Sequence, residues 1–155
     1  MNADKLTKWG TLAANVGVLI GLALVLAELN QNRTVMRAQI RHELSASIVD
    51  MLHAEAAYPQ LADILRRAED GEMLTPTEQL QFNRRTNALL RYWEDVHYQY
   101  RLGLYDRSEF EAHRRVWAVS FASTQQVRSY WCAVREWYSP EFSAEMDRAL
   151  GDKPC

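Results

Sequence analysis

The chain opens with a long apolar stretch. Residues 9–27, WGTLAANVGVLIGLALVLA, carry no charge over nineteen positions, close to the roughly 20 residues with which a helix crosses about 30 Å of hydrocarbon. Lys5 and Lys8 precede the stretch beside Trp9, a combination typical of a membrane interface. The pattern predicts an N-terminal tail and transmembrane helix within residues 1–29.

Beyond this segment, apolar residues recur at steps of three and four, which indicates helices. The membrane helix is expected to continue to about Ala57, and further helices are expected at about 61–68, 75–102, 106–121, 127–138 and 139–150. No segment alternates as a strand does. The sequence therefore predicts an all-α protein, in which the transmembrane helix continues into a bundle of about five further helices over residues 30–150, followed by a flexible tail at 151–155.

Local signals mark several of the predicted helix ends. Thr75-Pro76-Thr77-Glu78 combines a capping hydroxyl, a proline at the first helical position and a glutamate at the third. Asp106-Arg107-Ser108-Glu109 repeats the capping-box pattern, and Gly71 and Gly103 follow the predicted second and third helices. The connections are short, which favours antiparallel packing of neighbouring helices.

Small residues form a stripe within the apolar stretch. Ala13, Gly17 and Gly21 recur every fourth residue, and Gly17 with Gly21 has the spacing that lets two helix backbones approach closely. Asn15 can add a hydrogen bond between helices. These four residues predict self-association through the membrane helix. The alternative, that glycine is simply common in membrane helices, stays open.

A cleavable signal peptide is a second interpretation of the same stretch. Two lysines precede the apolar run, and Val25-Leu26-Ala27 offers the small residues that a signal peptidase reads. The run is longer than a typical signal core, however, and helix-forming residues continue beyond it. We therefore favour an anchor that stays attached.

Charge and composition exclude some partners and bear on the side of the membrane. The net charge of −2 provides no general attraction for nucleic acid. Lys5 and Lys8 before the span are nearly balanced by three arginines after it. Cys132 and Cys155 form no disulfide framework by spacing, so we expect an inert buried thiol at Cys132, a loose Cys155 and a reducing compartment. The predicted location is the cell membrane, with the bundle on the cytoplasmic side.

The strongest candidate for chemistry is a pair on the third predicted helix. Glu94 and His97 form an E-x-x-H pair, as metal-binding bundles use. Glu109 and His113, four residues apart, can contribute to the same site. A complete di-iron set needs a second E-x-x-H, and the sequence has none. Metal binding by these four residues is therefore the alternative hypothesis.

No other motif points to an enzyme. The chain lacks a G-x-S-x-G elbow, a P-loop and a C-x-x-C pair. We expect no cofactor, no catalytic residue and no identifiable small-molecule substrate. The favoured function is a membrane-anchored interaction or assembly protein whose partners are membrane lipid and either a second copy or another membrane protein.

Three segments stand out along the chain: residues 28–33 (ELNQNR), 93–100 (WEDVHYQY) and 103–106 (GLYD). Together they resemble a family of small, uncharacterised bacterial membrane proteins with one span and a C-terminal helical domain, and they imply a location in the bacterial inner membrane. The resemblance extends from the membrane helix to Ser139-Pro140-Glu141-Phe142. It implies a bacterial single-span protein and brings no activity with it.

Overall fold

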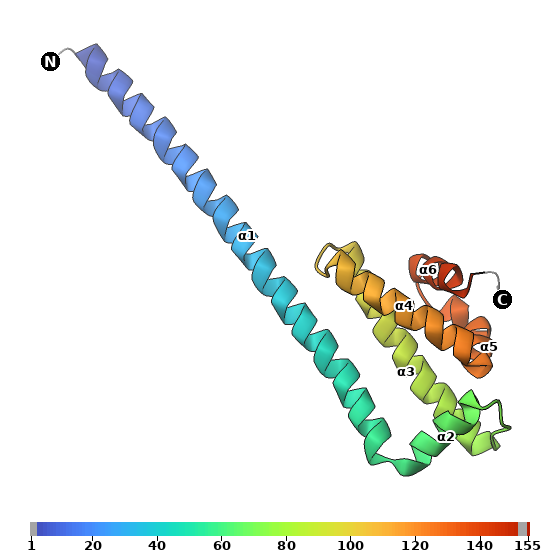
Figure 1. The fold of residues 1–155 in the computed structure, drawn as a ribbon. Helices are drawn as coiled ribbons and strands as arrows, with labels where there is room; N and C mark the ends of the chain where they lie inside the picture. The colour runs from blue at the N-terminus through green and yellow to red at the C-terminus, as the bar shows by residue number, and fades with distance from the viewer. Residues whose placement is uncertain (1–2, 152–154) are drawn as a thin grey trace. The chain divides into compact units, whose positions relative to one another are not determined.

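The computed structural model describes residues 3–151 and 155, with the side chains of residues 3–7 and of Ala122 left aside. Within this part the chain forms helices and no strands (Figure 1): α1 Ala3–Ala57, α2 Pro59–Glu69, α3 Pro76–Arg101, α4 Arg107–Ser123, α5 Gln125–Val134, a 3-10 helix Arg135–Trp137, and α6 Pro140–Leu150. The all-α prediction is confirmed, as is a long N-terminal helix followed by five further α-helices. The predicted tail falls largely on residues 152–154, outside the described residues.

Helix α1 belongs to two units, residues 1–39 and residues 40–155. Every described side chain from Lys8 to Gln39 is exposed. The first buried side chain of the helix is Leu44. The boundary between the two units therefore lies within α1, between Gln39 and Ile40.

The second half of α1 belongs to the bundle. Leu44 is buried, and Ile40, Ile48 and Met51 pack against the core from the same face. These positions follow the three- and four-residue spacing of one helix face. The apolar periodicity of the sequence predicts a helix to about Ala57, and the residues that pack here lie at that spacing.

Two ion pairs connect this half of α1 to other helices. Arg41 lies 3.0 Å from Glu109 of α4, and Glu55 lies 2.5 Å from Arg85 of α3. The pair with Arg85 is the better shielded, since both its side chains are at most one-fifth exposed. Such pairs help to orient the helices that they join and add modest stability. Removing one partner would leave the other charge partly desolvated.

The predicted capping box at the start of α3 is present. The Thr75 hydroxyl accepts a bond from the Glu78 amide at 3.4 Å, and the Glu78 carboxylate accepts one from the Thr75 amide at 2.8 Å. Glu78 also pairs with Arg67 of α2. The backbone bond from Thr75 and the Arg67 guanidinium together lower the pKa of Glu78 to about 2.

The start of α4 differs from the predicted capping box. Asp106 caps the helix by accepting a bond from the Ser108 amide at 2.8 Å. The Glu109 side chain pairs with Arg41 of α1 at 3.0 Å, so the first turn of α4 also takes part in a tertiary contact.

Two glycines end helices as predicted. Gly71 after α2 has φ of 75° and Gly103 after α3 has φ of 69°. Residues with a side chain rarely adopt this left-handed backbone conformation, whereas glycine adopts it without a steric cost. At each glycine the chain leaves its helix through backbone bonds back to the last turn.

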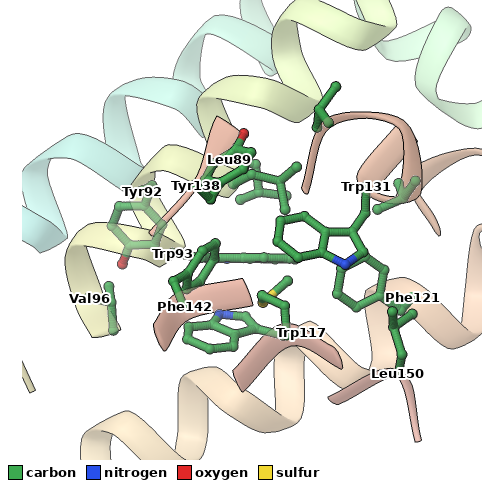
Figure 2. Close-up of a cluster of buried hydrophobic side chains, with 14 of the residues drawn as sticks. Leu89, Tyr92, Trp93, Val96, Trp117, Phe121, Trp131, Tyr138, Phe142 and Leu150 are labelled. Carbon is green, nitrogen blue, oxygen red and sulfur yellow. The ribbon is translucent and has the colours of Figure 1, made fainter. Parts of the chain in front are cut away.

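Aromatic side chains from four helices form the centre of the bundle. Trp93 of α3 stacks on Trp117 of α4 with ring centroids 5.6 Å apart. Phe142 of α6 lies edge-on to Trp117 at 5.9 Å and to Trp131 of α5 at 5.8 Å. Figure 2 shows these rings together with Tyr138 and Phe121 in one cluster. Burial of such large side chains is the main stabilising contribution.

Helix α5 ends earlier than the sequence predicted. Its α-helical part stops at Val134, and residues 135–137 tighten into a 3-10 turn instead of continuing to Tyr138. Tyr138 is buried, and its hydroxyl donates to Asn87 of α3 at 2.7 Å. The Arg135 carbonyl accepts a bond from Ser143. Tertiary contacts of Tyr138 and Ser143 therefore accompany the change of helix type.

The prediction of two separate thiols is wrong. Cys132 of α5 and Cys155 form a disulfide, with Cα atoms 5.3 Å apart and a sequence separation of 23. The fold provides this proximity. Asp147 of α6 pairs with Arg135 at 2.6 Å, so α6 lies along the end of α5 and returns the chain toward Cys132. Helix-by-helix reasoning could not have found this pairing.

Candidate functional site

Glu94 of α3 holds the start of helix α6 in place. Its carboxylate accepts a hydrogen bond from Arg91 at 2.7 Å and another from the Ser139 amide at 2.8 Å. Ser139 directly precedes α6, so Glu94 binds a backbone donor at the start of that helix. Arg91 in turn donates to the carbonyl of Trp137 and lies over the Tyr138 ring. Glu94 is therefore already bonded on both carboxylate oxygens.

His97 lies one turn further along α3, inside the aromatic core. It is only 7% exposed, and its ring centroid is 5.9 Å from those of Phe110 and Phe142. Burial lowers the pKa of His97, against an opposing effect of the nearby Glu145 carboxylate. A neutral imidazole among aromatic rings is a packing residue in this arrangement.

The second pair, Glu109 and His113, lies on α4. Glu109 is held by Arg41, and the Nε2 atom of His113 is 3.0 Å from the Tyr105 hydroxyl. His113 also lies edge-on to Tyr92 with centroids 5.9 Å apart. Burial lowers the pKa of His113, so its ring is neutral at pH 7.

These four residues do not form a shared site. Within the residues that the structure describes, no group of three or more His, Cys, Asp or Glu side chains could hold a metal ion. Each of the two glutamates is committed to an arginine, and each of the two histidines to aromatic neighbours. The geometry gives the metal hypothesis no support.

The membrane-helix residues lie on the exposed first part of α1. Ala13, Asn15, Gly17 and Gly21 are all exposed, and a Cβ added at either glycine meets nothing within 4 Å. One described helix, α1, has a window long and apolar enough to cross a membrane, and none of that window is buried. Length and composition alone also fit a signal sequence or the core helix of a soluble protein. Self-association stays a prediction.

A groove in the bundle is a feature that sequence reasoning missed. It has a volume of about 370 Å³ and lies between α3, α4 and the second half of α1. Trp93 and Leu89 line it from α3, and Val116 and His113 from α4. No local sequence signal marked it, because its lining residues come from separate helices. Trp117 is buried in the core, whereas its neighbour Val116 is 56% exposed.

Comparison with protein-family models, with curated proteins and with solved structures finds no match to this chain. The resemblance to single-span bacterial membrane proteins therefore stays a prediction. Function has to be argued from the apolar helix, the disulfide and the bundle surface.

Proposed function

We propose that this chain is a membrane-anchored helical interaction protein, whose apolar helix spans the bilayer and self-associates there. The observation that carries the proposal is the exposure of the whole apolar window of α1. Leu12, Leu19, Leu22 and Leu26 are each more than half exposed. A contiguous apolar surface of this kind needs a cover, and hydrocarbon is the cover that its length fits.

Self-association through the small-residue stripe completes this proposal. Gly17 and Gly21 leave open space on the helix, so a second helix can approach the backbone closely. Asn15 lies in the same apolar segment, where its amide is stabilised by a hydrogen-bonding partner. A second copy of this helix supplies both a surface that packs closely against the two glycines and an amide that can pair with Asn15.

The disulfide bears on the side of the membrane that carries the bundle. Disulfides form and persist in oxidising compartments and are rare in the cytosol. The expectation of a cytoplasmic bundle relied partly on two free thiols, and Cys132 and Cys155 are joined. We therefore place the bundle on the oxidising side. The near balance of basic residues around the span is compatible with either orientation.

Membrane extraction tests the anchor. Membranes from cells that express the full chain are washed with alkaline carbonate, and the intact mass of the retained protein is measured. The proposal expects the chain to stay in the pellet with residues 9–27 attached. Release by carbonate, or a mature protein that begins after Ala27, would contradict it and would favour a secreted domain.

A further inference from the structure

Large apolar side chains on α1 follow a seven-residue repeat that continues past the end of the apolar stretch. Written as heptads, the first and fourth positions hold Leu12, Asn15, Leu19, Leu22, Leu26, Leu29, Arg33, Met36 and Ile40. Five of the six leucines between residues 12 and 29 occupy these positions. Seven residues make close to two helical turns, so such a repeat presents one stripe of side chains to a partner helix. We name this stripe, from Leu12 to Met36, the leucine seam.

The helix that carries the leucine seam is continuous, and the seam is uncovered. Helix α1 runs without a break from Ala3 to Ala57 (Figure 1). All five leucines of the seam are more than half exposed, and Met36 is 47% exposed. Ile40, the next position of the repeat, packs against the bundle core instead. The uncovered seam therefore ends where the bundle begins.

Part of the leucine seam lies beyond the residues that hydrocarbon would cover. Glu28 and Arg33 follow the apolar stretch, so Leu29 and Met36 lie outside the bilayer core if residues 9–27 span it. In a single copy of the described chain, water surrounds these two side chains. Packing against a protein partner would remove them from water, which is favourable for apolar surface.

The leucine seam and the glycine stripe lie on different sides of α1. Gly17 and Gly21 fall at the sixth and third positions of the heptad, which point away from the first and fourth. Asn15 falls at a fourth position, so its amide meets another helix across the leucine seam. The two sides can therefore bind different copies of the helix.

The membrane anchor makes a second copy of this chain the natural occupant of the seam. Two copies that enter one bilayer in the same orientation run parallel and hold the same residues at the same depth. Leu29 then lies opposite Leu29 and Met36 opposite Met36, which is the in-register packing of a parallel coiled coil. A surface that meets its own copy in this way is self-complementary, as the interfaces of two-fold dimers are.

Arg33 favours a pair of helices over a larger bundle. It occupies a first heptad position, so its side chain starts inside the leucine seam. Between two helices, the arginine methylenes can lie along the seam while the guanidinium reaches water at its edge. The amide oxygen of Asn32, the neighbouring residue, is an acceptor at that edge. A polar residue at such a position is a known determinant of register and helix number.

We propose that residues 12–36 of α1 form a parallel, two-stranded coiled coil with the same residues of a second copy. The contact begins within the bilayer and continues for about 14 Å beyond Ala27, at the rise of an α-helix. The parallel, in-register alignment rests on the proposed membrane anchor. The choice of face does not rest on the glycine stripe.

Cysteine crosslinking of the full chain, in membranes of the cells that express it, tests this pairing. One cysteine at a time is introduced within residues 28–39. Cys132 and Cys155 are joined to each other, so the introduced thiol is the one available to oxidation. Copper phenanthroline links two copies when their introduced thiols face each other, since a disulfide needs Cα atoms within about 7 Å. Non-reducing gels report the yield of dimer.

The crosslinks should follow the heptad repeat. Leu29→Cys, Arg33→Cys and Met36→Cys lie in the leucine seam and should each give a strong dimer band. Gln31→Cys and Val35→Cys occupy the same heptad positions as the two glycines and should give several-fold less dimer. Equal yields at all five positions would overturn the seam. Dimers strongest at residues 31 and 35 would also overturn it, and would place the second copy on the glycine side.

Matched serine variants test the apolar contacts themselves. Leu29→Ser with Met36→Ser should lower the dimer yield of Arg33→Cys at least about tenfold, because two buried apolar side chains are lost from the contact. Val35→Ser removes an exposed apolar side chain from the other side of the same segment and should leave the yield unchanged. The proposal is refuted if the two changes have the same effect.

The seam, the anchor and the glycine stripe fail separately in these experiments. Absence of dimers at every seam position, in a chain that carbonate does not release, would refute the coiled coil and retain the anchor. Dimers at the seam that persist in Gly17→Leu with Gly21→Leu would support the coiled coil as a contact distinct from the glycine stripe.

Discussion

Cys132 on α5 and Cys155 beyond α6 are joined by a disulfide that closes a segment containing the 3-10 turn and all of α6. The two cysteines have 5.3 Å between their Cα atoms. The bond therefore ties the segment that follows α6 to α5.

Replacing either cysteine should destabilise the bundle. A disulfide that closes a loop of this length is worth about 3 kcal/mol, because it restricts the unfolded chain. Cys132→Ser, Cys155→Ser and the double variant should therefore lose similar free energy of unfolding, measured by urea denaturation of the full chain in mild detergent. Equal stability of the wild type with and without reductant would show that the bond contributes nothing.

Two buried tryptophans should respond differently to removal of the indole nitrogen. The Nε1 atom of Trp117 is buried without a hydrogen-bond partner, whereas Nε1 of Trp131 donates to Asp147 at 3.4 Å. An unsatisfied buried donor costs about 1–3 kcal/mol, which offsets the volume lost in Trp117→Phe.

We therefore expect Trp117→Phe to be the milder of the two variants. Trp131→Phe loses both volume and a bond, and leaves Asp147 with one donor fewer. Denaturation followed by tryptophan fluorescence compares them directly. The account of the core is contradicted if Trp117→Phe proves the more damaging.

The bundle should lose stability on mild acidification because of His97. Burial lowers the pKa of this imidazole below its ordinary value of 6.5, so the folded chain holds it neutral while the unfolded chain takes up a proton. Stability is then full above about pH 6.5 and falls as the pH drops through the lowered value. His113 should add to the same dependence of stability on pH, because burial lowers its pKa as well.

His97→Leu should flatten this slope between pH 7 and pH 5, a window chosen around the ordinary imidazole pKa of about 6.5. His53→Gln, at an exposed position of α1, serves as the control and should leave the slope unchanged. The measurement is the free energy of unfolding at a series of pH values. An unaltered slope in His97→Leu would mean that its protonation is not coupled to folding.

Bulk added to the small-residue stripe should weaken self-association. Gly17→Leu with Gly21→Leu blocks close approach of two helices, and the open space at both positions means that a single helix tolerates the change. Ala23→Leu adds the same kind of bulk on another face of the helix. A dimerisation reporter in membranes should give a clearly lower signal for the glycine variant alone; equal signals would remove the stripe from the proposal.

The helices were predictable from the sequence because their signals are local. Thr75 and Glu78 mark the start of α3, and Gly71 and Gly103 mark helix ends, without knowledge of the fold. The early end of α5 was not predictable, since no proline or glycine stands near Val134. Its cause lies in contacts with α3 and α6, which a single helix does not contain.

The site features were harder to predict because they join distant segments. The disulfide depends on the return of α6 to α5, and the groove draws on α1, α3 and α4. Conversely, spacing alone made Glu94 and His97 look like a ligand pair, although Glu94 accepts a bond from the Ser139 amide and His97 is a core residue. The sequence spacing placed Glu94 and His97 on one face of α3, but the neighbouring helices determine what each side chain contacts.

Limited proteolysis of sealed membrane vesicles of known orientation tests the central claim most directly. The account predicts that protease on the oxidising side removes the bundle, that a fragment containing residues 9–27 stays in the membrane, and that Cys132 and Cys155 resist alkylation until a reductant is added. Digestion only from the cytosolic side with freely alkylated cysteines, or a chain that washes off the vesicles intact, would contradict it.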